Sequence, residues 1–304
     1  MTRISVVDDS TEWQRDLRLR LRASYAKSAL GAEAAERRLQ EVCAGSDAWT
    51  LAELTDAGTR MGHVAVVVAD DNGTQAGRIV DLRVEARHAG RGHERVARDW
   101  AEKWCAERGA TRLDVRLTEP AGELFAGCRV RGQLRAKRLG ARPEPVGGAT
   151  ARPMTRAEYP EWLDAEKAAY VGDIVRSGAL GRDEAVRKSD RDFAKVIPEG
   201  LATPDNTFLV LEAAGERIGT GWLKHRYLPG VTYGYSLTIH EEHRRKGYGL
   251  LAMAAGERAT LEAGDAALMF TVWGGNETAM KLYTRAGYRV VEENLSIALP
   301  RSAT

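Results

Sequence analysis

The feature that most constrains the fold of this 304-residue chain is an internal repeat. Two segments match without a gap at a constant offset of 155 residues, so that Leu82-Arg83-Val84 corresponds to Leu237-Thr238-Ile239. The same offset joins Gly92 with Gly247, Glu102 with Glu257, Glu107 with Glu262, Gly109 with Gly264, Leu113 with Leu268 and Gly132 with Gly287. A period of this length indicates a duplicated domain and not a solenoid, whose repeats are much shorter.

The two copies are expected to meet in a segment rich in proline and glycine, GARPEPVGGATARP at residues 140–153. Such a composition favours a linker, because proline ends regular elements and glycine loosens the backbone. We therefore predict a first domain over residues 1–140, a linker over 141–153 and a second domain over 154–304.

Each copy reads as alternating strands and helices. In the second copy, helices are expected at residues 158–170, 183–195, 250–263 and 277–285, and strands at 207–212, 217–224, 232–239, 267–272 and 288–299. Asp183 is predicted as an N-cap, and Gly264 and Gly287 as the glycines that end two of the helices. The predicted fold class is α/β of the α+β kind, with two tandem domains, each a mixed, mainly antiparallel sheet flanked by helices.

The charge balance argues against a polyanionic partner. Lys and Arg number 45 and Asp and Glu number 43, so the net charge is only +2, and neither nucleic acid nor a membrane surface is expected as a partner. Asp8 and Asp9 stand where a secretory signal needs an apolar segment, and the apolar run at residues 64–69 is too short to span a bilayer. The expected location is cytoplasmic, with three reduced cysteines and no metal site.

The segment that carries the chemistry is IHEEHRRKGYG, residues 239–249, where a strand runs through a glycine-containing loop into a helix. Free backbone N–H groups in the first turn of a helix, together with the positive end of its dipole, form an anion site. The cations at residues 244–246 add positive charge, while Gly247 and Gly249 let the backbone approach a ligand closely. The pattern favours a pyrophosphate, but it is neither a Walker loop nor a dinucleotide fingerprint, which need other spacings.

These residues resemble the signature of the GNAT superfamily of N-acetyltransferases, in which Arg or Gln, two residues, Gly, one residue and Gly or Ala bind the pyrophosphate of coenzyme A. Arg244, Gly247 and Gly249 fill that pattern. A second element, NETAMKLYTRAGY at residues 276–288, looks like the Asn, helix, Leu-Tyr and Gly-aromatic pattern of the family and follows at the expected distance. The resemblance covers essentially the whole second copy and, more faintly, the first, so the chain is similar to tandem GNAT proteins.

The resemblance implies that an amine attacks the thioester carbonyl of acetyl-CoA, or of another acyl-CoA, directly. A backbone N–H near Ile239, on a strand splayed from its neighbour, would polarise the carbonyl, and Tyr283 would protonate the departing thiolate. The residues implied in binding the donor are Leu237, Thr238, Ile239, Arg244, Arg245, Lys246, Gly247, Tyr248, Gly249, Leu250, Asn276 and Tyr283. Asn276 fits a second interpretation equally well, since Asn also caps helices.

The sequence leaves the identity of the general base open. Many members of the family place a Glu six residues before the position of Ile239, where this chain has Tyr233, whose pKa is too high for an efficient base. Either Tyr233 or Tyr235 could order a water that takes the proton, and an amine with a low pKa needs no base from the protein. The charged residues 240–243 are better explained as a solvated loop.

The first copy lacks most of the implied site residues. At the offset of 155, Arg244 is replaced by Ala89, Gly249 by Glu94, Asn276 by Ala121 and Tyr283 by Cys128, whereas Gly247 is retained as Gly92. Glu94 would place a carboxylate where phosphate oxygens should approach, and like charges repel. A competing register over residues 87–92 also fits the loop pattern but breaks the offset. The first domain is therefore predicted to be a degenerate, non-catalytic copy that packs against the second and walls its acceptor pocket.

Three functions remain open. The first is an N-acyltransferase that moves an acetyl or other acyl group from coenzyme A to an amine of a small molecule. The second uses the same fold with a longer acyl-CoA, a carrier-protein thioester or an aminoacyl-tRNA, and the third is a non-catalytic acyl-CoA-binding protein. An intact Tyr283 argues against the third, because a sensor needs no acid for a leaving group. The chain is expected to be a monomer or a homodimer. Candidates for the lining of the acceptor pocket are Trp162, Asp164, Tyr170, Asp173, Trp222, Tyr227 and Tyr235.

Overall fold

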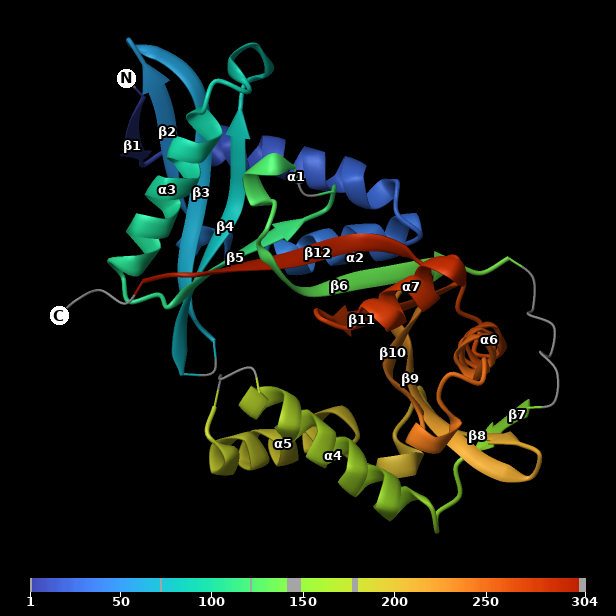
Figure 1. Cartoon of the computed structure of the whole chain (residues 1–304). Helices are drawn as coiled ribbons and strands as arrows, with labels where there is room; N and C mark the ends of the chain where they lie inside the picture. Colours follow the sequence, from blue (N-terminus) through green and yellow to red (C-terminus); the bar gives the residue numbers. More distant parts are fainter. Residues whose placement is uncertain (1, 72, 121, 141–148, 177–179, 301–304) are drawn as a thin grey trace.

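The computed structural model describes residues 2–71, 73–120, 122–140, 149–176 and 180–300. Figure 1 shows how the elements of the first half precede those of the second. The first half forms β1 (Arg3–Val7), α1 (Thr11–Ala26), α2 (Ala32–Val42), η1 (Ser46–Ala48), β2 (Thr50–Asp56), β3 (Thr59–Asp71), β4 (Thr74–Val84), η2 (Ala86–His88), α3 (His93–Ala106), β5 (Arg112–Leu117), η3 (Glu123–Phe125) and β6 (Arg129–Arg138).

The second half repeats this order, with the helix α7 in the place of the 3-10 helix η3. It forms β7 (Ala149–Pro153), α4 (Tyr159–Arg176), α5 (Arg182–Val196), η4 (Gly200–Ala202), β8 (Asn206–Ala213), β9 (Glu216–Leu228), β10 (Val231–Ile239), η5 (Glu241–His243), α6 (Tyr248–Glu262), β11 (Ala267–Trp273), α7 (Glu277–Arg285) and β12 (Arg289–Ala298). Residues 149–153, which the sequence placed in the linker, form strand β7, and residues 141–148 lie outside the described part of the chain.

The strands join in one sheet of the order β1-β2-β3-β4-β5-β12-β6-β11-β10-β9-β8-β7. The pairs β4–β5 and β10–β11 are parallel, and the other described pairs are antiparallel. Helix α3 packs on β3, β4 and β5, and α6 packs on β9, β10 and β11 in the same way. The predicted fold class, a mixed and mainly antiparallel sheet flanked by helices in each copy, is confirmed.

The two halves exchange their last strands. Strand β6 of the first half lies between β11 and β12, and β12 of the second half lies between β6 and β5. Figure 1 shows β6 and β12 side by side across the middle of the molecule, so that the chain ends beside the first half. Each of the segments 1–140 and 154–304 gives one strand to the sheet of the other. The predicted domain boundaries therefore divide the chain and not the sheet, and they stay a prediction.

The repeat offset of 155 holds through β5 and β11 and then fails. Ala76 pairs with Arg112 as Val231 pairs with Ala267, which matches the offset at both positions. Gly132, however, lies within β6, whereas Gly287 ends α7 with a φ of 88°; Gly127, with a φ of 79°, occupies the equivalent turn. The reason is that α7 has nine residues where the first half has only the three-residue η3. Tyr283 and Cys128 are therefore not equivalent positions.

The helices predicted for the second copy are present, and α7 has the predicted bounds. The N-cap assigned to Asp183 is wrong: Gly181 caps α5, and Asp183 lies in the first turn, where its carboxylate still favours the positive end of the helix dipole. Residues 288–299 form the single strand β12 instead of several strands. Over the ranges described above, no helix combines the length and the apolar character that a membrane crossing requires.

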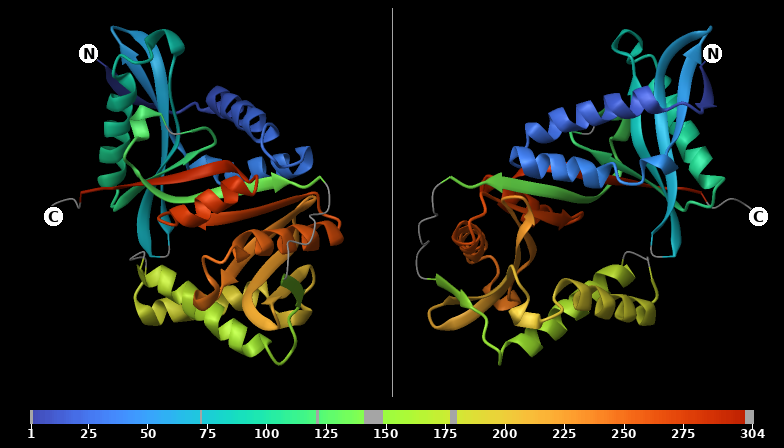
Figure 2. Two further views of the ribbon diagram at one scale, coloured as in Figure 1. Left: turned by 45° about the vertical axis from the view of Figure 1, so that its right-hand side comes forward. Right: turned by 180° about the vertical axis from the view of Figure 1, so that it is seen from behind.

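A buried ion pair joins the two halves beneath β12. Glu292 of β12 is 1 % exposed, and its carboxylate accepts hydrogen bonds from Nε and Nη2 of Arg38 at 2.7 and 2.8 Å and from the hydroxyl of Tyr25 at 2.8 Å. Burial raises the pKa of Glu292, but the hydrogen bonds and charges of Arg38 and Arg116 outweigh it, so the pKa lies below its ordinary value. Around the pair, helices α1 and α2 pack on β6, β10 and β11 of the shared sheet (Figure 2).

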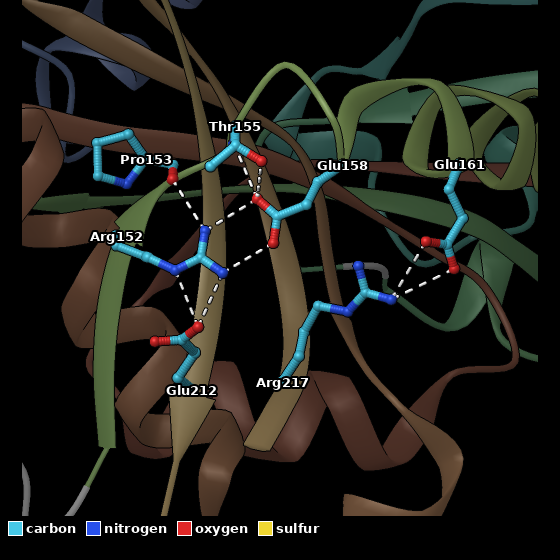
Figure 3. A network of polar contacts seen from close by, with 7 residues as sticks. All are labelled: Arg152, Pro153, Thr155, Glu158, Glu161, Glu212 and Arg217. Carbon is cyan, nitrogen blue, oxygen red and sulfur yellow. Dashed lines mark hydrogen bonds and ion pairs between the residues drawn. The ribbon is translucent and has the colours of Figure 1, made fainter. Parts of the chain in front are cut away.

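Helix α4 is held at its start by Arg152 of the edge strand β7 (Figure 3). The guanidinium binds Oε1 and Oε2 of Glu158 at 2.7 and 2.9 Å and Oε1 of Glu212 at 2.8 Å. Glu158 also accepts hydrogen bonds from the backbone N–H of Thr155 at 2.8 Å and from its hydroxyl at 2.7 Å, just ahead of the helix. The cation of Arg152 and the bonds from Thr155 lower the pKa of Glu158. These contacts fix α4 relative to β8 and to the strands beside it.

We expect the substitution Arg38→Met to lower the free energy of unfolding at pH 7 by about 3 kcal/mol, because it removes the cation that hydrogen-bonds to a buried carboxylate and leaves only the more distant Arg116, at 3.4 Å. Since the folded pKa of Glu292 lies below the unfolded value of about 4.3, this contribution is present above that pH and is lost as the pH falls further. Urea denaturation at pH 7 and pH 4 should therefore show a larger difference at pH 7. Arg22→Met, which breaks an exposed pair with Glu36, is the control and should change little.

Candidate active site

The site begins where strands β10 and β11 stop pairing. They pair over Val231–Gly234 and Ala267–Phe270, and β10 then continues for five residues without β11 as a neighbour. On its other edge, β10 stays paired with β9 as far as Ile239. The result is a fork in the sheet with one free strand edge on β10.

A β-bulge at Tyr235 marks the base of this fork. Gly234 pairs with Leu223 and Ser236 pairs with Trp222, so that Tyr235 is one residue extra on β10. The ring of Tyr235 stacks on Trp222 with centroids 4.3 Å apart, which places it on the face of the sheet that α4 covers. The first half has the same bulge, since Asp81 pairs with Ala65 and Ile79 with Val66.

The backbone of β10 offers free N–H groups to the fork. The N–H of His240 donates to the carbonyl oxygen of Ile218 at 2.9 Å. In an antiparallel pair, alternate residues turn their N–H and C=O groups to opposite edges, so Leu237 and Ile239 face the fork. The carbonyl oxygen of Ile239 is already bound by Nε of Arg244 at 3.0 Å, on the edge away from β9.

An apolar cavity lies at the base of the fork, between the two strands and α6. It is lined by Leu209, Gly221, Leu223, Gly234, Tyr235, Ser236, Leu237, Ala252, Met253, Gly256, Leu268, Phe270, Thr271 and Tyr283. The cavity thus brings together two predicted site residues, Leu237 and Tyr283. Ile239 and Tyr233, two residues predicted to be catalytic, are not among its lining residues.

Tyr283 of α7 presents a neutral phenol to this cavity. Its ring is half-buried and packs against Phe270 with centroids 4.5 Å apart. Burial raises the pKa of Tyr283, and the charge of Arg135 offsets only part of that effect. The phenol therefore keeps its proton at neutral pH, which a general acid requires.

Tyr233 is held by a structural hydrogen bond. Its hydroxyl donates to Oγ1 of Thr271 at 3.0 Å, and burial raises its pKa. The ring packs in the cluster that contains Leu39 of α2, so the first half covers this side of the second. A buried phenol with a raised pKa does not accept a proton near neutrality, and the contacts of Tyr233 favour a packing role.

The loop before α6 has the geometry of an anion site. Arg245 and Gly247 have φ values of 62° and 86°, and Gly247 is the N-cap of the 15-residue helix. The side chains at residues 244–246 are exposed, as is the N-cap Gly247, whereas Tyr248 and Gly249 in the first turn are half-buried. Gly249 also has a packing role: a Cβ there would lie 2.8 Å from Cδ2 of Leu282, so this glycine allows α7 to pack closely on α6, while its predicted role in donor binding stays a prediction.

The equivalent loop of the first half is closed by its own carboxylate. Gly90 and Gly92 have φ values of 74° and 88°, which match Arg245 and Gly247 and confirm the offset of 155 over this loop. Oε1 of Glu94 accepts a hydrogen bond from the N–H of Gly90 at 3.1 Å. One of the loop N–H groups that would bind an anion in the first half is thus already occupied by a protein anion.

Asn276 is the N-cap of α7, and its Oδ1 accepts the N–H of Ala279 at 3.1 Å. This contact accounts for the residue by helix capping alone. Its predicted counterpart in the first half, Ala121, lies outside the described residues, and Cys128 is a half-buried free thiol.

The aromatic residues proposed for the acceptor pocket fall into two groups. Trp162, Trp222 and Tyr235 form one cluster, in which the centroids of the two indoles are 5.7 Å apart. Tyr227 packs instead on Tyr233, at 4.7 Å. The other candidates are engaged elsewhere or exposed: Tyr170 donates to Asp192 at 2.8 Å, Asp173 pairs with Arg176 at 3.0 Å, and Asp164 is exposed.

One residue of the site is missing from the sequence prediction. Glu166 lies one turn after Trp162 on α4, is half-buried and faces Ser236 on the bulge. Burial raises its pKa, and the interactions with Ser236 and Trp162 lower it by less. The signal available in the sequence was the spacing of four between Trp162 and Glu166, which puts both side chains on one face of a helix.

The chain is similar in sequence and fold to known proteins. Residues 180–288 match the Acetyltransferase (GNAT) family. An uncharacterized N-acetyltransferase of Bacillus subtilis, YycN, is 29% identical over 148 residues, which cover 47% of this chain and 94% of that protein. A mycothiol acetyltransferase of Nocardiopsis dassonvillei is 27% identical over 214 residues, 68% of this chain and 61% of that protein. The crystal structure of a GCN5-related N-acetyltransferase from Sphaerobacter thermophilus superimposes with a TM-score of 0.54 at 16% identity, covering 97% of this chain and 94% of that one.

Substitution of Asn276 by Ala should lower stability by about 1 kcal/mol, because the N–H of Ala279 loses its partner. Asn276→Asp keeps an acceptor at the N-cap and should unfold like the wild type. Thermal and urea unfolding of the three proteins measure this difference. Equal stability of the Ala variant would show that the cap contributes nothing and would favour the role of Asn276 in donor binding.

Proposed function

We propose that this chain, whose second half carries a GNAT acetyltransferase domain, moves an acetyl group from acetyl-CoA to an amine of a small-molecule acceptor. The observation that carries the proposal is the convergence of three features on the fork of the sheet. These are the free N–H edge of β10, the phenol of Tyr283 and the exposed helix start at Gly247. Together they supply the parts that acyl transfer from a bound thioester needs.

The donor is expected to bind along β10 and the start of α6. The pyrophosphate of coenzyme A fits the N-terminal turn of α6, where the exposed cations at residues 244–246 add charge. The pantetheine arm fits the free edge of β10, because its amide groups can pair with the carbonyl oxygen of Leu237 and the N–H of Ile239 as a further strand would. The thioester then reaches the cavity at the base of the fork.

Within that cavity, the backbone N–H of Leu237 is the preferred donor to the carbonyl oxygen. Leu237 lines the cavity together with Tyr283, whereas Ile239 lies two residues further out on the same edge. The amine attacks the carbonyl carbon, a C–N bond forms, and the charge on oxygen is stabilised by this N–H. The C–S bond then breaks, and Tyr283 gives its proton to the sulfur and regains one from solvent.

Acetyl-CoA should bind once per chain, in the second half. We expect the substitution Gly249→Glu, which introduces the residue found in the first half, to weaken binding roughly 10- to 100-fold, the size of one or two charge-assisted contacts. Gly249→Ala is the matched control, because it adds the Cβ next to Leu282 without the charge. Isothermal titration calorimetry measures both, and two sites per wild-type chain would contradict the closure of the first loop by Glu94.

Removal of the phenol proton should separate catalysis from binding. In Tyr283→Phe, kcat is expected to fall by about 10² to 10⁴, the usual contribution of a general acid. The dissociation constant for coenzyme A should stay within about threefold, because the ring still packs on Phe270. Tyr227→Phe, at a tyrosine outside the cavity, is the control for turnover. An unchanged kcat in Tyr283→Phe would remove the residue from the mechanism.

A further inference from the structure

Three polar side chains lie close together on the α4 side of the fork, and the contacts of one of them, Glu166, with the other two fall short of normal hydrogen-bond geometry. Nε1 of Trp162, a residue that is 6 % exposed, and Oγ of Ser236 are both buried, and neither has a hydrogen-bond partner in the described chain. The carboxyl group of Glu166 faces both of them. Buried polar groups without partners are rare and mark places where a ligand or water completes the hydrogen bonds.

The same place in the first half is filled. Asp81 occupies the position of Ser236 after the bulge, and its carboxylate accepts Nε1 of Trp13 at 2.9 Å and pairs with Nε2 of His63 at 2.8 Å. Nη1 of Arg20 donates to the same carboxylate at 3.2 Å. Burial raises the pKa of Asp81, but His63 and Arg20 outweigh it and hold the pKa below its usual range. The first half thus contains a buried carboxylate, an indole N–H and an internal cation.

The second half keeps two of these parts and lacks the third. The indole is Trp162 and the carboxylate is Glu166, now supplied by α4 instead of the strand. Thr220 stands at the position of His63, since it pairs with Thr238 as His63 pairs with Arg83. No cationic side chain forms an ion pair with Glu166 within the residues that the structure describes. Among the described residues of the second half, no cation therefore takes the place that Arg20 has beside Asp81 in the first half.

We propose that Glu166, Ser236 and Trp162 form the binding site for the ammonium group of the acceptor, and that Glu166 is the general base. This inference rests on the proposed acetyl transfer. Ser236 directly precedes Leu237, so an amine held at Ser236 lies beside a carbonyl whose oxygen is bound by the N–H of Leu237. The ring of Tyr235, which is stacked on the buried Trp222, lines the neighbouring cavity, and this favours a primary amine with an aromatic or otherwise apolar body.

The proton balance of the step follows from this placement. The acceptor enters as R–NH₃⁺ and transfers one proton to the carboxylate of Glu166, and its lone pair then forms the C–N bond. As the tetrahedral intermediate collapses and the C–S bond breaks, the nitrogen gives its second proton to water, and Tyr283 regains a proton from solvent after it has protonated the sulfur. Tyr283 protonates the sulfur, so the products are the acetamide, coenzyme A as thiol and one proton released to solvent through Glu166.

The surroundings of Glu166 suit a base that works near neutrality. The groups that face it are the hydroxyl of Ser236 from β10 and the indole of Trp162 from its own helix, and no charged group among the described residues contacts it. Burial raises its pKa toward the range in which a carboxylate is an effective base. The carboxylate form is the active one, so the rate should fall as the pH drops through this pKa.

The test uses the full chain with acetyl-CoA and 2-phenylethylamine as acceptor, with 2-phenylethanol as the uncharged match. In Glu166→Gln, kcat/KM for the amine is expected to fall about 10²- to 10³-fold and the acid limb of its pH profile to disappear. Coenzyme A affinity should stay unchanged. Ser236→Ala should lose less, and Asp164→Asn, at an exposed carboxylate of the same helix, should keep the wild-type rate.

Calorimetry on the complex with coenzyme A gives a readout that does not depend on turnover. The wild type should bind the amine and not the alcohol, and Glu166→Gln should bind the amine at least tenfold more weakly. Acetylation that persists in Glu166→Gln within about threefold, with its acid limb intact, would overturn the inference while the proposed function stands. Binding of the amine that depends on Glu166 without any acetylation would instead overturn the proposed function and leave the ammonium site in place.

Discussion

The loss of pairing between β10 and β11 beyond Gly234 is the constraint on which the rest of the site depends. A parallel pair that continued to Ile239 would use the N–H groups of Leu237 and Ile239 in the sheet and would leave no edge for a ligand. The bulge at Tyr235 separates the strands at that point and turns Tyr235 and Ser236 toward α4. One backbone irregularity therefore supplies the donor edge on one side of β10 and the polar cluster of Glu166 on the other.

The two halves share this backbone arrangement and differ in which groups provide partners for its polar atoms. In the first half, Glu94 binds the loop N–H of Gly90, and at the bulge Asp81 forms an ion pair with Arg20 and a hydrogen bond with His63. Internal ion pairs and hydrogen bonds of this kind stabilise a fold but leave no free group for a ligand. In the second half, Gly247 at the loop is exposed, and Trp162 Nε1 and Ser236 Oγ near the bulge have no partner among the described residues. Such unmet hydrogen bonds lower stability, as is common at functional sites. Duplication thus gives one copy that supports the sheet and one copy with an open site.

Much of the fold followed from the sequence because the repeat and the hydrophobic patterns are local features. The offset of 155 predicted the equivalence of the loops at Gly92 and Gly247, and the φ values agree. The exchange of β6 and β12 did not follow, since strand order depends on long-range pairing that no local pattern encodes. The equivalence of Gly132 and Gly287 failed because α7 is longer than its counterpart. Glu166 was missed because its burial depends on how α4 packs against the bulge.

We propose that the chain has a single donor site, in the second half, and that side chains of the first half block the equivalent loop there. Amide hydrogen exchange followed by mass spectrometry, with and without acetyl-CoA, tests it most directly, because the two loops are read in one experiment. We expect slower exchange in residues 237–250 on addition of acetyl-CoA and no change in residues 82–95. Equal protection of both segments, or protection of residues 82–95 alone, would contradict it.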